Sequence, residues 1–387
     1  MDQIRMGIVG FGGMGLQHAK TIMENVKEVR LAAVASKNAA NIEKMRAFPG
    51  GQDVKVFDTA KDMYESGEID AVLIASPHRA HVAQAKEAFA AGMHVLLEKP
   101  VGEHTQEVRE MIAAADACGK AFGVMFNQRT HPAYQKMKEI VASGEMGEIR
   151  RTNIVITDWF RAQSYFDSCD WRATWKGEGG GVLLNQAPHN LDLWQWICGM
   201  PVRVHAFVGF GRWHDIEVDD DVTAYVEYAN GATGTFVTCT GEAPGSNRFE
   251  ISMDGGQLLY EKGRLLQTRT EMPVGQFIRE YAGGFGKPET VTEDITPDGE
   301  YTMHAGVTRA FARHILYGEP MLADGREGIN SLMLANAMLL SGFTGETIDM
   351  PFDAETDARY AKLLEERAAK SPDKVAKPIV MDLNKSF

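Results

Sequence analysis

The chain has 387 residues, of which 44% are hydrophobic and 24% are charged, and its formal net charge at pH 7 is −13. This length allows two domains, and the composition is that of an ordinary globular protein. The acidic balance argues against nucleic acid or an anionic membrane surface as the main partner.

An apolar strand is expected at residues 4–9, followed by a helix that begins near Gly13. Between them lie three glycines with the spacing G-x-G-x-x-G: Gly10, Gly12 and Gly15. In a dinucleotide-binding fold such glycines allow a tight turn, close approach of the backbone to a pyrophosphate, and close packing of helix on strand. A second strand at 29–35 arrives within the spacing that this fold requires.

The alternation of strand and helix continues to residue 125. Further strands are expected at 55–57, 71–75, 93–97 and 121–125, and helices at 60–66, 80–91 and 105–118. Apolar strands that alternate with helices predict a parallel, doubly wound sheet. We therefore expect a Rossmann domain over residues 1–125, with its ligand beyond the carboxyl ends of the strands.

Candidate cofactor-binding residues follow these strand ends. They are Gly10, Gly12, Gly13, Met14, Gly15, Ser36, Lys37, Ser76, Pro77, His81, Glu98 and Lys99. Ser36 and Lys37 stand where a dehydrogenase that prefers NAD usually carries an acidic residue. A hydroxyl and a cation suit the 2′-phosphate of NADP, so the pattern favours NADP, with a solvated turn lysine and NAD binding as the alternatives.

The stretch Glu98-Lys99-Pro100 ends the strand predicted at 93–97. An isolated lysine in a turn is usually a surface residue. This lysine, however, lies on the same predicted edge as the glycine loop and stands between a carboxylate and a proline. We therefore favour a functional lysine held beside the cofactor.

From residue 126 onward the pattern is typical of an α+β domain. Strands are expected at 149–157, 202–210, 222–228, 232–240, 248–253 and 257–261, and helices at 133–143, 302–317, 325–341 and 354–369. Asn230-Gly231 and the stretch MDGGQ predict hairpins, and hence an open, mainly antiparallel sheet. We expect this domain to span 126–387, with roughly the last 15 residues as a tail. Helices or another subunit must cover one face of the sheet, so a homo-oligomer is expected.

The segment 179–199 begins with three glycines and contains Asn185, His189 and Asp192. If Asn185 caps a helix, this spacing places all three side chains on one helix face. A histidine with a carboxylate one turn away is a plausible general base. The alternatives are a histidine bonded within the core and an aspartate that forms a salt bridge.

Candidate substrate-binding residues lie at the start of the second domain and around this segment. They are Asn127, Arg129, Tyr165, Trp171, Arg172, Asn185 and His189. Aromatic faces combined with polar groups suit a sugar ring. Packing at the domain junction is an equally good explanation for the aromatic residues.

Cysteine and histidine patterns predict neither a disulfide framework nor a metal site. The four cysteines include no CxxC, and no HExxH occurs among the histidines. No apolar run approaches the roughly 20 residues that a membrane-spanning helix needs, and the first residues lack a signal-peptide cleavage site. We therefore expect a cytoplasmic protein.

Three residue sets together resemble the Gfo/Idh/MocA family (glucose-fructose oxidoreductase, inositol dehydrogenase and relatives). They are Gly10-x-Gly12-x-x-Gly15, Glu98-Lys99-Pro100, and Gly179-Gly180-Gly181 leading to Asn185 and His189. The resemblance implies a Rossmann domain followed by an open-sheet domain that joins dimers or tetramers. It implies that Lys99 bonds the reacting hydroxyl near the nicotinamide and that His189 is the acid/base. Many members carry aspartate at the position of Asn185, so a three-residue proton relay is in doubt.

The resemblance implies a nicotinamide-dependent enzyme that oxidises a secondary hydroxyl of a sugar, glycoside or cyclitol. The variant NQAPHNLDLWQW is similar to members that oxidise glucosides at C3. A second possibility is a redox-neutral enzyme that retains its nicotinamide for glycoside cleavage or internal transfer. A third is a sugar-binding regulatory protein, which the presence of both Lys99 and His189 disfavours.

Overall fold

The computed structural model describes residues 3–377, and this part of the chain forms two compact units. The first unit comprises the chain up to Ala142 together with 191–197 and 297–333. The second unit comprises 143–190, 198–296 and the chain from Leu334 onward. The predicted division at 125/126 therefore lies inside the first unit, just after its last sheet strand.

The first unit is built on a parallel sheet with the strand order β3-β2-β1-β4-β5-β6. Its strands are β1 (Ile4–Val9), β2 (Val29–Ala35), β3 (Lys55–Phe57), β4 (Ala71–Ile74), β5 (His94–Leu97) and β6 (Phe122–Val124). Almost every residue of the central strands is buried, as expected for a sheet with helices on both faces. The order reverses between β1 and β4, which is where such sheets bind their ligands. The predicted doubly wound sheet is confirmed.

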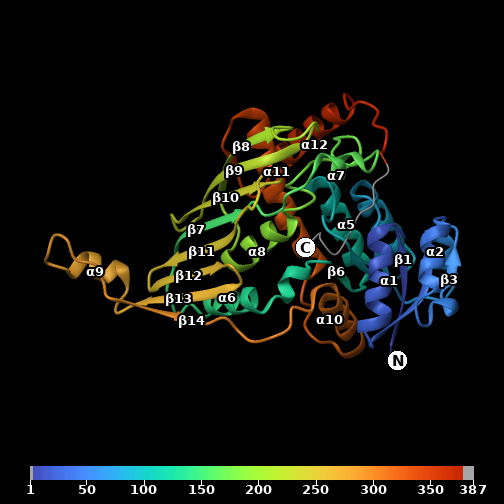
Figure 1. Cartoon of the computed structure of the whole chain (residues 1–387), viewed down its shortest axis with the longest axis horizontal. Coiled ribbons are helices and arrows are strands. Elements are labelled where there is room, and N and C mark those ends of the chain that lie inside the picture. Colours follow the sequence, from blue (N-terminus) through green and yellow to red (C-terminus); the bar gives the residue numbers. More distant parts are fainter. Residues whose placement is uncertain (1–2, 378–387) are drawn as a thin grey trace. The chain divides into compact units, whose positions relative to one another are not determined.

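Helices and short 3₁₀ turns connect these strands. They are α1 (Gly13–Asn25), α2 (Ala39–Arg46), η1 (Gly51–Asp53), α3 (Ala60–Glu65), η2 (His78–Ala80), α4 (His81–Ala90), α5 (Thr105–Cys118), η3 (Asn127–Thr130), α6 (Pro132–Ser143), α10 (Met303–Tyr317) and η4 (Gly325–Glu327). Figure 1 shows α10 beside α1, although Arg309 of α10 follows its bonding partner Asn25 by 284 residues. Val307 and Phe311 of α10 join the core of the parallel sheet. The first unit is thus completed by a helix from late in the chain.

The second unit contains a larger sheet with the order β14-β13-β12-β11-β7-β10-β9-β8-β15. Its strands are β7 (Ile149–Ile156), β8 (Arg203–Phe210), β9 (Asp219–Glu227), β10 (Thr233–Cys239), β11 (Asn247–Met253), β12 (Gly256–Glu261), β13 (Arg264–Thr270), β14 (Thr290–Asp294) and β15 (Ile348–Asp349). Among the described strands, β7 and β10 pair in parallel and the other neighbours are antiparallel. The prediction of a mainly antiparallel sheet is confirmed.

Both predicted hairpins are present. Asn230 and Gly231 connect β9 to β10, and Gly231 has a φ of +83°, which glycine adopts without strain. The remaining helices are α7 (Gln163–Asp167), α8 (Pro188–Cys198), α9 (Val274–Glu280), α11 (Gly328–Thr344) and α12 (Ala354–Ala368). Helices α8 and α11 contribute residues to both units.

Three structural observations concern the other expectations about the whole chain. Over residues 3–377, no helix is both long and apolar enough to cross a membrane. In the same range, no group of three or more His, Cys, Asp or Glu side chains is arranged to hold a metal ion. The predicted tail lies partly outside the described residues, and its described part, 371–377, contains neither helix nor strand.

Candidate functional site

The glycine loop between β1 and α1 is shaped by two contacts and one open position. A Cβ atom at Gly10 would lie 2.3 Å from the amide nitrogen of Ser76, and one at Gly15 would lie 2.4 Å from the carbonyl oxygen of Gly10. A Cβ atom at Gly12 would meet no atom within 4 Å. Gly12 also caps α1 without a side-chain hydrogen bond, which leaves main-chain N–H groups facing outward. This open cradle at a helix N-terminus fits a dinucleotide pyrophosphate.

Ser36 and Lys37 follow β2, next to the glycine loop in the sheet. The Ser36 hydroxyl accepts a hydrogen bond from the amide of Asn38, and the Lys37 side chain is exposed. Asn38 caps α2, and Asn41 of that helix donates to the carbonyl oxygen of Phe11 in the glycine loop. The loop that carries Lys37 is therefore fixed to the loop that would hold the pyrophosphate.

His81 connects the ends of β4 and β5. Its Nε2 lies 2.8 Å from the carbonyl oxygen of Ser76, and its Nδ1 lies 2.7 Å from that of Pro100. A neutral imidazole can donate to only one of these oxygens. Burial lowers the pKa of His81, which favours the neutral ring. The His81 ring therefore lies between two strand-end loops, one of which contains Lys99, and donates to only one of them.

Glu98 lies directly before Lys99 and is held by a histidine from α1. Its Oε1 lies 2.7 Å from Nε2 of His18, and its Oε2 accepts a hydrogen bond of 3.1 Å from the amide of Lys99. Burial alone would raise the pKa of Glu98, but the hydrogen bond and charge of His18 hold it well below its usual range. The ionised Glu98 thus fixes the backbone of Lys99, whose side chain is half-buried and whose bond to Pro100 is cis.

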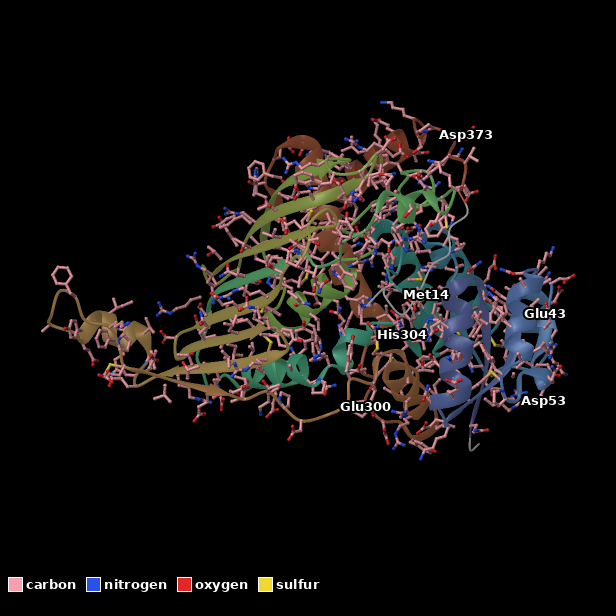
Figure 2. All side chains as sticks on the ribbon, in the orientation of Figure 1. Met14, Glu43, Asp53, Glu300, His304 and Asp373 are labelled. Atoms are coloured by element: carbon pink, nitrogen blue, oxygen red, sulfur yellow. The ribbon has the colours of Figure 1, made fainter. Side chains whose placement is uncertain are left out.

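A second histidine lies against this pair. His304 lies at the start of α10 (Figure 2). Its ring meets the ring of His18 edge to face at 5.2 Å. Its Nε2 lies 3.3 Å from Nδ2 of Asn127, whose side chain is also buried. Burial, with a contribution from His18, lowers the pKa of His304 to about 4, so the ring is neutral at pH 7. Asn127, a predicted substrate residue, is therefore part of the network behind Lys99.

Arg129 was predicted to bind substrate, but its side chain is buried and bonded to carboxylates. Its guanidinium is 1% exposed and donates to both carboxylate oxygens of Asp192, at 2.8 and 2.7 Å. It also donates to Glu327 at 2.5 Å and lies over the rings of Phe126 and Trp196. Asp192 thus forms a buried salt bridge inside the first unit, which is the alternative that the sequence left open.

The glycines at 179–181 are held by an aspartate that the sequence did not single out. The Asp219 carboxylate, at the start of β9, accepts hydrogen bonds from the amides of Gly181 at 2.6 Å and Leu183 at 2.8 Å. A Cβ atom at Gly181 would lie 1.9 Å from the Asp219 carbonyl oxygen, so only glycine fits. Burial raises the pKa of Asp219 to about 6, although the two amides oppose this effect.

Asn185 and His189 both belong to the second unit. Helix α8 begins at Pro188, so Asn185 lies in the turns before the helix. The expectation of one helix face for Asn185, His189 and Asp192 was therefore wrong at its first residue, because the turn continues from Gly181 until Pro188. His189 is buried in the first turn of α8, whereas the Asn185 amide is half-buried and donates to Glu178.

The aromatic candidates of the second unit form one cluster. The Arg172 guanidinium lies 4.2 Å from the centre of the Tyr165 ring and 4.9 Å from that of Trp171, and it donates to the Tyr165 hydroxyl. Gln186 donates to the same hydroxyl at 3.3 Å. The predicted set Tyr165, Trp171 and Arg172 is thus brought together, in the manner expected of a cation stacked on aromatic faces.

Residues 371–377, which we call the C-terminal strap, lie against the loop that carries this cluster. The ammonium of Lys374 donates to the carbonyl oxygens of Phe166 and Arg172, both at 2.7 Å. Lys377 pairs with Asp167 at 2.7 Å, and the Ser371 hydroxyl donates to Glu217. The part of the predicted tail that is described therefore holds the candidate substrate loop from outside.

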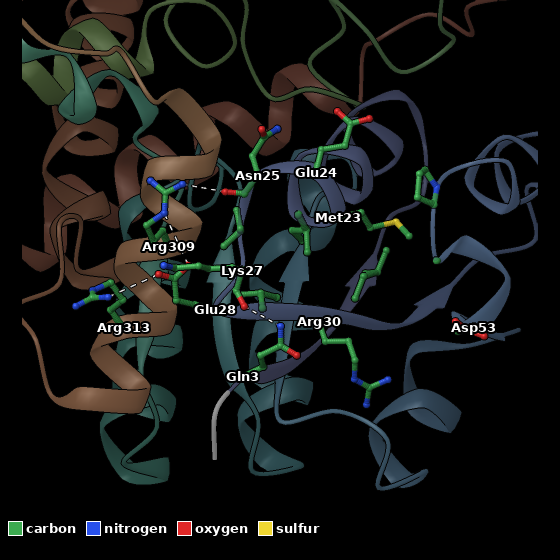
Figure 3. Close-up of a pocket in the computed structure, with 16 residues that line it drawn as sticks. Gln3, Met23, Glu24, Asn25, Lys27, Glu28, Arg30, Asp53, Arg309 and Arg313 are labelled. Atoms are coloured by element: carbon green, nitrogen blue, oxygen red, sulfur yellow. Dashed lines mark hydrogen bonds and ion pairs between the residues drawn. The ribbon is translucent and has the colours of Figure 1, made fainter.

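A groove of about 990 Å³ lies elsewhere in the first unit, at the amino ends of β1 and β2 (Figure 3). Arg309 donates there to the carbonyl oxygen of Asn25 at 2.8 Å, and Arg313 faces the buried Glu28 at 3.6 Å. In an open parallel sheet, ligands bind at the carboxyl ends of the strands. We therefore assign this groove to the packing of α10 on α1 and not to the candidate site.

The first unit thus offers a dinucleotide cradle beside a lysine on a rigid support, and the second offers a histidine, an amide and an aromatic-cationic cluster. Sequence reasoning missed His18, His304, Glu178 and Asp219. The position of Glu178 directly before three glycines was a usable signal. His18 and His304 occur within ordinary amphipathic helices and gave none.

Two family models match the chain. Residues 4–126 match the oxidoreductase family with an NAD-binding Rossmann fold, and residues 134–259 match the GFO/IDH/MocA C-terminal domain. The rhizopine catabolism protein MocA of Rhizobium meliloti is 31% identical over 51% of this chain and 58% of its own length. The trans-1,2-dihydrobenzene-1,2-diol dehydrogenase of Bos taurus is 28% identical over 64% of this chain and 71% of its own length.

A solved structure covers more of the chain. The WlbA dehydrogenase from Chromobacterium violaceum, in complex with NADH and UDP-GlcNAcA, superposes with a TM-score of 0.77 and 25% identity, over 91% of this chain and 97% of that one. The order of the two family models along the chain agrees with the glycine loop, the Glu98-Lys99-Pro100 turn and the open sheet. The chain belongs to the Gfo/Idh/MocA family of oxidoreductases.

Proposed function

We propose that the protein is a nicotinamide-dependent oxidoreductase that oxidises a secondary hydroxyl of a sugar, a glycoside or a cyclitol. The observation that carries this proposal is the buried pair of His18 and Glu98, which supports Lys99 near a glycine loop with room for a pyrophosphate. The names of two similar proteins, a diol dehydrogenase and a dehydrogenase solved with NADH and UDP-GlcNAcA, favour the same reaction class.

The proposed roles follow from the chemistry of each side chain. Lys99 donates a hydrogen bond to the reacting hydroxyl and stabilises its oxygen as negative charge develops there. His189 accepts the hydroxyl proton as a general base. Asn185 accepts a hydrogen bond from a substrate hydroxyl. When bound, the nicotinamide would accept the hydride from the carbon that carries the hydroxyl.

For the cofactor, Gly12, Gly13 and Met14 would hold the pyrophosphate through main-chain N–H groups. We propose NADP as the preferred form, because the exposed Lys37 ammonium can pair with a 2′-phosphate. A Lys37→Asp variant is then expected to shift the ratio of kcat/KM toward NAD by at least about tenfold. An unchanged ratio would show that Lys37 is an ordinary surface residue.

For the substrate, the Tyr165, Trp171 and Arg172 cluster supports a ring with several hydroxyl groups, since it combines aromatic faces with a cation. Within this class we propose a glucoside that reacts at C3. A panel of methyl glucosides that lack single hydroxyl groups identifies the reacting carbon. Equal turnover of the 3-deoxy compound would exclude C3.

We also propose a homo-oligomer that forms through the sheet of the second unit. Phe207 of β8 is 73% exposed and Tyr225 of β9 is 44% exposed. The strand register pairs Tyr225 with His205, two residues from Phe207, so these aromatic side chains lie on one face of the sheet. Light scattering of a Phe207→Glu variant is expected to show a smaller species than the unmodified protein.

The first experiment identifies the cofactor and the reaction together. The purified protein is denatured and any released nicotinamide is identified by mass, and reduced-cofactor absorbance is then followed with glucosides, free sugars and inositols. A steady rise that disappears in Lys99→Ala, while that variant still binds cofactor, is the expected result. Turnover in Lys99→Ala at the unmodified rate would overturn the role of Lys99. Product without a net change in absorbance would show the redox-neutral reaction instead.

A separate test addresses the general base. His189→Ala is expected to lower kcat by roughly 10²–10⁴-fold at pH 7, with a smaller loss at high pH where hydroxide replaces the base. A parallel pH profile for the variant and the unmodified enzyme would contradict the proton-accepting role.

A further inference from the structure

Asn185 is fixed by a buried carboxylate seven residues earlier in the chain. Glu178 is 1% exposed, and its Oε1 accepts a hydrogen bond from Nδ2 of Asn185. Its Oε2 accepts a second hydrogen bond, of 2.6 Å, from the amide of Ala173. Both oxygens of Glu178 therefore act as acceptors for groups on two different segments, as the oxygens of a carboxylate do.

This contact determines which end of the Asn185 amide faces Glu178. If the amide were turned over, its carbonyl oxygen would meet the carboxylate, and two acceptors would repel each other. The N–H end therefore faces Glu178, and Oδ1 lies at the other end of the planar amide group. Asn185 as a whole residue is half-buried.

Glu178 is itself placed by a strained turn. Ala173 has a φ of +55°, a left-handed conformation that costs a residue with a side chain about 1 kcal/mol or more. The amide of Ala173 is the group that donates to Glu178. The Glu178 carboxylate thus compensates for the turn at Ala173 and connects the Arg172 loop to Asn185.

We propose that Glu178 is a positioning residue, which orients the Asn185 amide so that its oxygen accepts a hydrogen bond from the substrate. This proposal rests on the proposed function, in which Asn185 bonds a substrate hydroxyl. Asn185 thus supplies a neutral acceptor at position 185. The negative charge stays on Glu178, one hydrogen bond further from the substrate. A carboxylate at position 185 would have to share that space with Glu178.

The charged groups around Glu178 do not remove this conflict. Burial opposes the charge of Arg172, but Tyr165 and the Glu178 carboxylate raise the pKa of Arg172 overall. Burial lowers the pKa of Lys374, and Asp167 and Glu178 act in the opposite sense. Lys374 already donates to two carbonyl oxygens, and Arg172 already donates to the Tyr165 hydroxyl.

The test is a reciprocal exchange of the two side chains. Asn185→Asp alone places two carboxylates in contact and is expected to lower kcat/KM by roughly 30-fold or more at pH 7. Glu178→Gln alone lets the Asn185 amide turn over, with an expected loss of about tenfold. The double variant Glu178→Gln, Asn185→Asp restores an oriented acceptor, because the new amide donates to the new carboxylate. It is expected to recover to within about fivefold of the unmodified enzyme.

The control is Glu217→Gln. Glu217 is another carboxylate that accepts a main-chain hydrogen bond from this loop, at 2.9 Å from the amide of Trp175, and it also accepts one from the Ser371 hydroxyl. This variant is expected to leave the effect of Asn185→Asp unchanged. If the losses in Asn185→Asp and Glu178→Gln simply add in the double variant, the positioning role is refuted.

A measurement without substrate separates this inference from the proposed reaction. In Asn185→Asp the paired carboxylates release their protons less readily in the folded state, so its thermal midpoint should fall below that of the unmodified protein as the pH rises from about 5 to 8. The double variant should follow the unmodified protein. If no sugar is oxidised but this pattern holds, the pairing stands and the proposed function fails. If Asn185→Asp shows no such pH dependence, the pairing itself is wrong.

Discussion

Nε2 of His18 lies 2.7 Å from Oε1 of Glu98, and these two residues are 1% and 6% exposed. His18 belongs to the helix that follows the glycine loop, and Glu98 directly precedes Lys99. The pair therefore joins the candidate cofactor loop to the candidate catalytic lysine through groups that water barely reaches. In such surroundings the loss of one partner leaves an unpaired charge.

Replacement of His18 by leucine tests this relationship. The variant leaves the Glu98 carboxylate buried beside Lys99 without its ring partner, and we expect the free energy of unfolding to fall by about 3 kcal/mol. Urea denaturation measures the change. Glu98→Gln in the same background removes the charge and is expected to restore part of the loss. If the losses in free energy of unfolding caused by His18→Leu and by Glu98→Gln simply add in the double variant, the two groups do not interact.

The pH dependence of the free energy of unfolding should show that His304 is held neutral in the folded state. Burial lowers the pKa of His304 to about 4, whereas an unfolded histidine titrates near 6.5. The lowered pKa of His304 stabilises the folded state fully above about pH 6.5. This contribution to the free energy of unfolding, of up to about 3 kcal/mol, is lost as the pH falls toward 4. His304→Phe is expected to flatten this slope, and thermal midpoints between pH 4 and 7 measure it.

The slope should decrease without disappearing, since burial also lowers the pKa of His94 to about 4. His205→Phe, on β8 of the second unit, is a matched control for the loss of one histidine. A curve for His304→Phe that is parallel to that of the unmodified protein would mean that His304 is not held neutral in the folded state.

Substitution of two glycines in the loop should have different effects, one on cofactor binding and the other on folding. Gly12→Ala adds a methyl group where no atom lies within 4 Å, so the fold should persist while cofactor affinity falls by roughly tenfold or more. Gly10→Ala adds it 2.3 Å from the amide nitrogen of Ser76, so the fold itself should be destabilised. Fluorescence titration with reduced cofactor and thermal unfolding measure the two effects. Equal behaviour of the two variants would contradict this assignment.

The strap should control the mobility of the loop that it contacts. Lys374→Met removes both hydrogen bonds to Phe166 and Arg172, and we expect amide exchange in 163–178 to accelerate by about tenfold. The matched control is Lys370→Met, because Lys370 is exposed and precedes the strap. If amide exchange in 163–178 is equally fast in Lys374→Met and Lys370→Met, the strap does not hold the loop.

Regular periodicity made much of the fold predictable. The strands β1, β2 and β3 and the helix α5 begin and end where the sequence predicts, because apolar runs and amphipathic spacing are local signals. The strand β14 was missed for the opposite reason, whereas β13 was missed although its burial alternates. Every residue of β14 is exposed, so its side chains show no alternation, and only pairing with β13 defines it as a strand.

The candidate site was predictable only where its residues lie in recognisable motifs. Lys99 and Gly12 follow strand ends, and Asn185 and His189 follow a run of glycines. His18 and Asp219 contact these motifs from helix and strand positions many residues away, and such contacts depend on tertiary packing. Arg129 shows the converse, since a polar residue at a promising position is fully engaged by Asp192 and Glu327.

The construction of the first unit from separate parts of the chain has a consequence for synthesis in the cell. Val307, Phe311 and Ala312 belong to the same core as Ile4 and Ile8, but they leave the ribosome about three hundred residues later. Until then this core lacks its residues from α10, although 143–190 and 198–296 of the second unit have already been synthesised. The first unit therefore cannot complete its core before α10 has been synthesised.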